Sequence, residues 1–259
     1  MRTASSNYFR PVFAITLALL FSQGLLAAES PPIGDFSQCT YKAGKDAGDL
    51  DKATAYWQQQ MAKIYPEGGS YLGVIYTPIW GSGESDFVWG GFSPNLNDWA
   101  TGTTEYLSHK EAEAANARFE AVADCTPANA YVVSQLHQGA EPKPDDNDSI
   151  TEVFACTLHD GKTMTNAMAA EKAWDAQAKA MGYPVSSWRF TPTWANTQID
   201  LVYMVAHDDL PAFGANNTNW MSYAGSGAIN AGFSAVMSCE SFVMSTKIVS
   251  RPAPGSWPE

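Results

Sequence analysis

An internal duplication constrains the fold of this chain more than any other feature of its sequence. The segment YTPIWGSGESDFVW begins at Tyr76, and FTPTWANTQIDLVY begins at Phe190, 114 residues later. Both contain Thr-Pro, a Trp two residues further on, an Asp six residues after the Trp, and a Val two residues after the Asp. Agreement at five such positions has a chance probability of about one in a million per placement, so the chain contains two copies of one unit.

The agreement extends in both directions from these segments. CTYKAGK at Cys39 matches CTLHDGK at Cys156, and Trp57 matches Trp174. The two units therefore cover residues 35–139 and 151–250, and residues 251–259 form a C-terminal tail. Residues 140–150 are rich in Pro and Asp, which predicts a solvated linker; their Asp residues lack the spacing and the Gly of an EF-hand calcium loop.

The hydrophobic pattern changes in the same order within each unit. A short apolar strand precedes a helical segment, residues 49–65 or 165–182, and Gly182 is a plausible helix end. Two strands follow, residues 71–80 and 86–92 or 185–194 and 200–207, rich in β-branched and aromatic residues. We expect a long loop next, then a second helix, residues 111–125 or 228–239, and a final strand, residues 128–137 or 240–249. Each unit thus has the order βαββαβ.

This duplicated order resembles the dimeric α/β-barrel superfamily, in which two ferredoxin-like units set their sheets together as a barrel. The resemblance covers nearly all of the chain after its N-terminal leader. It implies an α+β fold in which two tandem βαββαβ units form an intramolecular dimeric α/β-barrel. It implies a range of activities but transfers no site residue, because the sequence matches no catalytic motif of a member family.

The four cysteines occupy equivalent places in the two units. Cys39 and Cys125 lie 86 residues apart, and Cys156 and Cys239 lie 83 apart. Because the last strand of a ferredoxin-like sheet runs antiparallel beside the first, we expect one disulfide in each unit. A metal or redox role usually needs closer spacing, such as C-x-x-C, and is the less favoured alternative.

The N-terminus and the net charge indicate an exported acidic protein. Residues 1–28 carry two Arg, an apolar run and a closing Ala pair, which is the layout of a secretory signal peptide. Its removal changes the formal net charge from -12 to -14. An acidic surface repels phosphate backbones and anionic lipids, so nucleic acid and, after signal cleavage, membrane are poor partner candidates. The protein is expected to be secreted or periplasmic, and its oligomeric state stays open.

Aromatic and amide side chains repeated in both units are the candidates for ligand binding. Aromatic residues line most small-molecule pockets, although they also fill cores, and the long loops after the third strands are typical functional segments. The candidate ligand-binding residues are Trp80, Trp194, Trp99, Trp220, Tyr203, Trp89, Asn95 and Asn216. Core packing is the alternative interpretation for each of them.

The second unit carries the candidate catalytic residues, because it differs there from the first. Arg189 stands where the first unit has Ile75, and His207 stands where it has Ser93. His suits proton transfer near neutral pH, a buried Arg suits an anionic group, and Asp200 is a candidate base. The alternatives are an Arg paired with acids at the sheet surface, a solvated His, and an Asp that closes a hairpin loop.

Three functions from different classes follow. The first is an exported protein that binds a small molecule, aromatic or apolar, in an aromatic-lined pocket. The second is a secreted enzyme of the dimeric α/β-barrel type: a cofactor-free oxygenase, an isomerase, or a haem protein with His207 or His137 as ligand. The third is a structural or partner-binding protein. No cofactor is implied by a motif, and the four dispersed His predict no metal site.

Overall fold

The computed structural model describes residues 30–81, 85–139, 147–195 and 197–257. The predicted signal peptide and most of the predicted linker lie outside the described residues. The first half consists of β1 (Ile33–Tyr41), α1 (Ala47–Ile64), β2 (Leu72–Trp80), β3 (Phe87–Ser93), α2 (Leu96–Leu107), α3 (Lys110–Glu120), β4 (Ala123–Cys125) and β5 (Asn129–His137). The second half consists of β6 (Asp148–Leu158), α4 (Met164–Met181), β7 (Ser186–Trp194), β8 (Leu201–His207), α5 (Leu210–Ser222), α6 (Ser226–Ser234) and β9 (Met237–Ser250).

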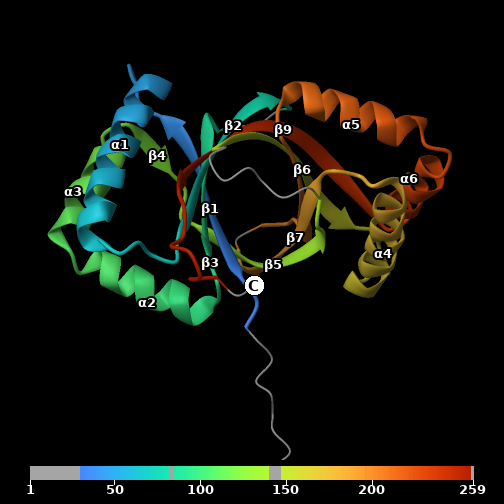
Figure 1. Ribbon diagram of the computed structural model, residues 1–259, viewed down its shortest axis with the longest axis horizontal. Coiled ribbons are helices and arrows are strands. Elements are labelled where there is room, and N and C mark those ends of the chain that lie inside the picture. The colour runs from blue at the N-terminus through green and yellow to red at the C-terminus, as the bar shows by residue number, and fades with distance from the viewer. Residues whose placement is uncertain (1–29, 82–84, 140–146, 196, 258–259) are drawn as a thin grey trace, which may run out of the picture. The chain divides into compact units, whose positions relative to one another are not determined.

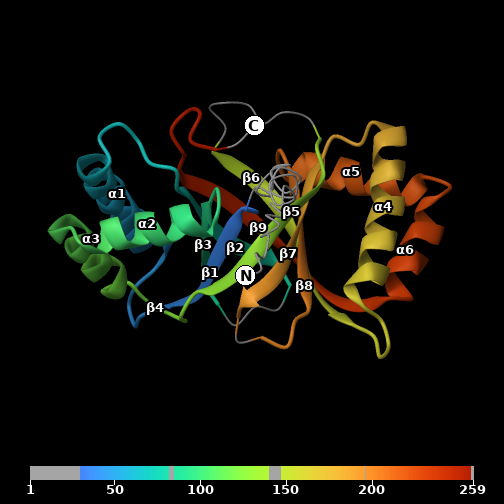
Figure 2. The same cartoon turned by 90° about the horizontal axis from the view of Figure 1, so that it is seen from below.

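The strands form a closed antiparallel barrel. They are hydrogen-bonded in the order β3-β2-β9-β6-β8-β7-β5-β1-β4, and a further pairing of β3 with β1 closes the ring of eight strands, with β4 alongside β1. The halves meet where β2 pairs with β9 and where β5 pairs with β7. Helices α1–α3 lie on one side of the barrel and α4–α6 on the other (Figures 1 and 2). The fold is the expected intramolecular dimeric α/β-barrel.

The strands are apolar on both faces because each covers two cores. In β2, Val74 and Tyr76 point into the barrel, where they join Phe92, Tyr131 and other buried side chains. Ile75, between them, points outward and packs with Trp57 of α1. This alternation places one helix-covered layer on the outer face of each half. Any site between helices and sheet must lie in one of these two layers.

The long loops expected after β3 and β8 are helical, and this prediction was wrong. Asn95 is the N-cap of α2, where its Oδ1 accepts from the backbone N–H of Asp98 at 2.9 Å, and Asp209 caps α5 in the same way. The Gly and Thr residues of α2 weaken the helical pattern, but a capped N-terminus and a packed face outweigh such propensities. The end predicted at Gly182 is confirmed: Gly182 is the C-cap of α4, with φ 60°.

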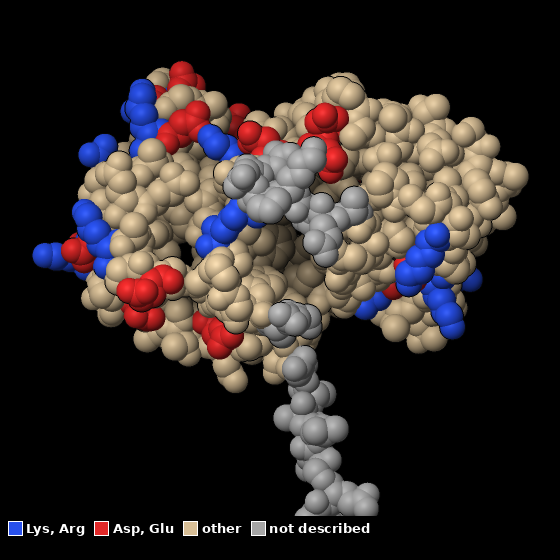
Figure 3. Space-filling model, in the orientation of Figure 1, with Lys and Arg blue, Asp and Glu red and all other residues tan. Residues whose placement is uncertain are grey.

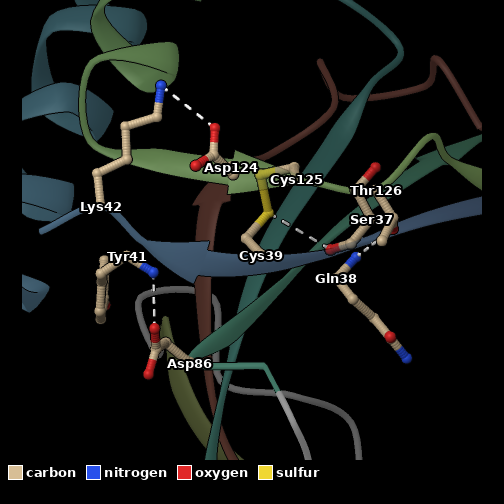
Figure 4. The surroundings of a disulfide bond; sticks show 9 residues. All are labelled: Ser37, Gln38, Cys39, Tyr41, Lys42, Asp86, Asp124, Cys125 and Thr126. Atoms are coloured by element: carbon tan, nitrogen blue, oxygen red, sulfur yellow. Dashed lines mark hydrogen bonds and ion pairs between the residues drawn. A yellow bond between two sulfur atoms is a disulfide. The ribbon is translucent and has the colours of Figure 1, made fainter.

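Both predicted disulfides are present. Cys39 is bonded to Cys125 (Figure 4) and Cys156 to Cys239, and the members of each pair lie opposite one another on antiparallel strands. Disulfides of this kind indicate an oxidising, non-cytoplasmic environment. β6 begins at Asp148, inside the range predicted as linker, because it pairs with β9 from its first residue.

Candidate functional site

The first half contains a large cavity between its helices and the outer face of its sheet. Its volume is about 1440 Å³, and its walls come from α1, α2 and α3, from β1, β3 and β4, from the segment before β2, from the end of β9 and from the start of the C-terminal tail. Ligand pockets usually measure ~300–1,000 Å³, so the space suffices for a ligand larger than a single ring.

Aromatic side chains form the inner wall of this cavity. Trp57 of α1 meets Trp89 of β3 edge to face, with 5.3 Å between ring centroids, and Trp89 meets Phe119 of α3 in the same way at 5.2 Å. Tyr71 packs against Trp57 at 6.3 Å, and its hydroxyl accepts from Trp89 Nε1 at 2.9 Å. These contacts fix the rings, so the wall is formed in advance of any ligand.

A partly buried carboxylate, that of Asp35, lies in the inner wall of the cavity. Asp35 of β1 stands opposite Gly91 of β3, which stands opposite Gly73 of β2. A Cβ at Gly91 would lie 2.6 Å from Asp35 Oδ1 and would also overlap the Tyr71 hydroxyl. The glycine therefore leaves the room that the carboxylate and the Tyr71 hydroxyl occupy.

The carboxyl group of Asp35 has hydrogen-bond partners for only part of its acceptor capacity. The Trp99 side chain from α2 donates a hydrogen bond to the carboxyl group, yet Oδ1 is buried and has no hydrogen-bond partner among the described residues. Burial raises the pKa of Asp35 to about 6, although the Trp99 hydrogen bond acts in the opposite direction. Burial, and then the charge of Asp35, also raise the pKa of Tyr71.

The second half fills the same layer with its own polar side chains. Glu152, the counterpart of Asp35, stands opposite Val205, which stands opposite Ser187. Val205 and Ser187 therefore take the places of Gly91 and Gly73 of the first half, and both are larger than glycine. Arg189 Nη1 lies 2.5 Å from Glu171 Oε2, and the Tyr203 hydroxyl donates to Glu171 Oε1 at 2.8 Å. The second half thus pairs Arg189 with Glu171, although Arg189 Nε and His207 Nε2 are buried without a partner among the described residues.

The candidate catalytic residues do not converge on one site. Asp200 and His207 lie at opposite ends of β8, about 23 Å apart at ~3.3 Å per residue. Asp200 Oδ2 accepts from the backbone N–H of Leu158 at 2.7 Å, and Asp86 accepts from that of Tyr41 at 2.6 Å (Figure 4). Both Asp residues thus fasten the first strand of their unit to the third, instead of closing the hairpin loop. Arg189 is held in its buried pair with Glu171.

Neither candidate haem ligand is placed to bind iron. His137 Nδ1 lies 2.9 Å from Asp175 Oδ1, and its Nε2 lies 3.1 Å from the carbonyl oxygen of Tyr183, so both ring nitrogens are engaged. The expected alternative of a solvated His207 is also wrong: its side chain is fully buried, with Nδ1 3.2 Å from Asn216 Nδ2 and Nε2 3.9 Å from Glu152. His207 Nε2 has no hydrogen-bond partner among the described residues, but neither His lines the first-half cavity, so that cavity offers no histidine to a haem iron.

The candidate ligand-binding residues fall into three groups. Trp89 and Trp99 line the first-half cavity. Trp220 and Tyr203 are buried in the second half, where Trp220 Nε1 donates to Asn230 at 3.3 Å, and Asn216 contacts His207. Trp80 and Trp194 are 55% and 57% exposed at their strand ends, and Asn95 caps α2.

Asp35, Tyr71 and Trp57 complete the site, and our interpretation of the sequence did not select them. One signal was available, because Asp35 and Glu152 hold the same place in the two copies, as the equivalent strand registers show. An acid retained at the centre of an apolar strand is unusual unless it has a partner or a function.

The described residues contain neither a metal-binding cluster nor a membrane-spanning helix. Over residues 30–257, apart from the gaps named above, no cluster of three or more His, Cys, Asp or Glu could hold a metal ion. In the same part of the chain, no helix has the length and hydrophobicity needed to cross a bilayer.

Comparison with known proteins supports the fold. No family model and no curated protein matches the sequence. Among solved structures, a candidate monooxygenase from Fusobacterium nucleatum has a TM-score of 0.58 at 9% identity, covering 87% of this chain and 96% of its own. An anthrone oxidase-like protein has a TM-score of 0.53 at 12% identity, and the match covers 88% of this chain and 96% of the other. A chlorite dismutase variant from Candidatus Nitrospira defluvii has a TM-score of 0.51 at 9% identity, and the match covers 85% of this chain and 93% of the other. These are dimeric α/β-barrel proteins, and at such identities the likeness establishes the fold alone.

Proposed function

We propose that this is an exported small-molecule-binding protein whose aromatic or apolar ligand lies in the first-half cavity. The observation that carries the proposal is the asymmetry between the two copies. The same layer is filled by an ion pair in the second half, and in the first it is a cavity with fixed aromatic rings and one unpaired carboxylate oxygen. Rings that provide area and a few polar groups that fix orientation are the usual composition of a binding pocket.

The proposal is tested by titrating 1-naphthalenemethanol into the purified, disulfide-bonded protein and measuring heat. We expect saturable binding to the native protein and at least a ten-fold weaker affinity in Gly91→Ala, because the added methyl group meets Asp35 and Tyr71. Gly214→Ala on α5 is the matched control, since an added Cβ there meets nothing within 4 Å. Equal affinity in Gly91→Ala would place the ligand elsewhere, and no binding at all would favour a structural or partner-binding role.

A second candidate is a cofactor-free oxygenase, and the pKa of Asp35 favours it. A carboxylate whose pKa is raised to about 6 is suited to remove a proton from a phenol or an activated C–H group near neutral pH. The substrate anion would then react with O₂. Two of the similar folds belong to a candidate monooxygenase and an anthrone oxidase-like protein.

Anthrone is the appropriate probe for this candidate. Its oxidation by one O₂ gives anthraquinone and water, and oxygen uptake can be followed with an electrode. The candidate predicts uptake above the buffer rate that Asp35→Asn lowers by at least ~100-fold, as expected for loss of a general base. Uptake at the buffer rate would leave the binding function in place and remove anthrone-type oxygenation.

A further inference from the structure

The unpaired oxygen of Asp35 is an acceptor available to a ligand. Oδ1 is buried and lacks a partner within the described part of the chain, and a buried carboxylate oxygen without a partner is costly. Gly91 and Gly73 have no side chain to offer, and the Tyr71 hydroxyl, which accepts from Trp89, makes no hydrogen bond to this oxygen. A donor on a molecule in the cavity would satisfy it.

The rings around the cavity favour a donor that carries positive charge. Trp57, Tyr71 and Trp89 line the cavity, and the Trp99 side chain donates to Asp35. Aromatic faces are electron-rich, and cages of Trp and Tyr attract ammonium groups more strongly than neutral ones. A carboxylate beneath such a cage adds a charge of the complementary sign.

The charge of the first half acts in the same direction. The cavity is lined by five acids and two basic residues, and one of the latter, Lys42, lies 3.2 Å from Asp124 in an ion pair. Residues 30–139 contain thirteen acids and six basic residues, against nine and six in residues 147–257. On the face shown in Figure 3, charged side chains gather over the first half, and the surface over α5 and α6 is almost free of them. The potential at the cavity is therefore negative and attracts cations.

The second half shows what completes such a layer. There the Arg189 guanidinium, at the position of Ile75, neutralises Glu171 of α4, whose counterpart in the first half is Thr54. The first half has neither member of this ion pair, and its own acid, Asp35, is the counterpart of Glu152.

We infer that the ligand of the first-half cavity is an organic cation, an amine with an aromatic or apolar body whose ammonium N–H groups donate to Asp35. This inference rests on the proposed binding function and narrows its ligand class. It also separates binding from the oxygenase candidate, because a substrate that must lose a proton to Asp35 would be a neutral acid such as a phenol.

Three probes of one shape test the charge requirement: 1-naphthylmethylamine, 1-naphthalenemethanol and 1-naphthoate, titrated at pH 7.5 by calorimetry. We expect the amine to bind about ten- to hundred-fold more tightly than the alcohol, as a charge-assisted hydrogen bond to a carboxylate predicts, and the naphthoate to bind most weakly. Asp35→Asn should reduce the preference for the amine to about two-fold or less. Asp160→Asn, the same change at an exposed turn, should leave it intact.

The outcomes separate the two proposals. If amine and alcohol bind equally and Gly91→Ala weakens both, the cavity binds small molecules but the cation inference is wrong. Tightest binding of the naphthoate would also overturn the inference, since it would assign the site to anions. If Asp35→Asn keeps the full preference for the amine while its circular dichroism is native, another group recognises the cation and the inference fails. Absence of binding by all three would contradict the binding function itself.

Discussion

Replacement of Asp35 by Asn should stabilise the protein in the absence of ligand, and the gain should depend on pH. The folded protein raises the pKa of this carboxyl group from 3.8 to about 6 because it is buried. A raised pKa means that the folded state prefers the protonated form. The contribution of Asp35 to stability is therefore fully present below pH 3.8 and is lost as the pH rises through about 6.

The magnitude follows from the two pKa values. A difference of about 2.2 corresponds to at most about 3 kcal/mol of lost stability above pH 7. Asn has nearly the same shape and does not ionise, so Asp35→Asn should avoid this loss. For a chain of this size the expected rise in Tm at pH 7.5 is up to about 6–12 °C.

Thermal unfolding followed by circular dichroism at pH 7.5 and pH 4 checks this prediction. The variant should melt higher than the native protein at pH 7.5 and at nearly the same temperature at pH 4. Asp160→Asn at an exposed turn should change the free energy of unfolding by no more than ~0.5 kcal/mol at either pH. The reasoning would be refuted by a variant that melts lower than the native protein at both pH values, because Asp35 would then be a satisfied structural residue.

Three further predictions concern the scaffold. Replacement of Cys39 and Cys125 together by Ala should lower the free energy of unfolding by roughly 2–5 kcal/mol, measured by urea unfolding; a loss below ~0.5 kcal/mol would contradict a structural role for the bond. Glu171→Gln leaves a buried guanidinium without its counter-charge, so it should cost ~3–5 kcal/mol in the same assay while probe affinity in the other half stays within two-fold. Trp80→Ala and Trp194→Ala remove exposed rings that are not part of the cavity lining, so neither should change probe affinity measured by calorimetry more than two-fold; a larger loss would move the site to the strand ends.

The sequence predicted the fold because duplication and strand patterning are local signals. The repeat of Thr-Pro-x-Trp at Tyr76 and Phe190 aligned the copies, and the alignment fixed the order of strands and the pairing of cysteines. The helices α2 and α5 were missed because their sequences are rich in Gly, Thr and Asn. Their stability comes from caps and packing, which a periodicity count does not register.

The site was less predictable because it depends on small side chains and on long-range register. Differences between the copies indicated Arg189 and His207 as functional, yet both are buried additions that complete the second half. The difference on which the proposed function rests lies where the first copy has smaller residues, at Gly73 and Gly91, which leave space beside Asp35. Trp99 reaches Asp35 from 64 residues further along the chain, and only the folded barrel brings these two residues together.

The location of the binding site is tested most directly by the indole N–H signals of the nine tryptophans in a ¹H–¹⁵N NMR spectrum. They are assigned by single Trp→Phe variants, and 1-naphthylmethylamine is then titrated into the disulfide-bonded protein. A site in the first half predicts that the signals of Trp57, Trp89 and Trp99 shift, while those of Trp174 and Trp220 stay in place. Shifts at Trp174 and Trp220 with the first three unchanged would contradict it and would move the site to the second half.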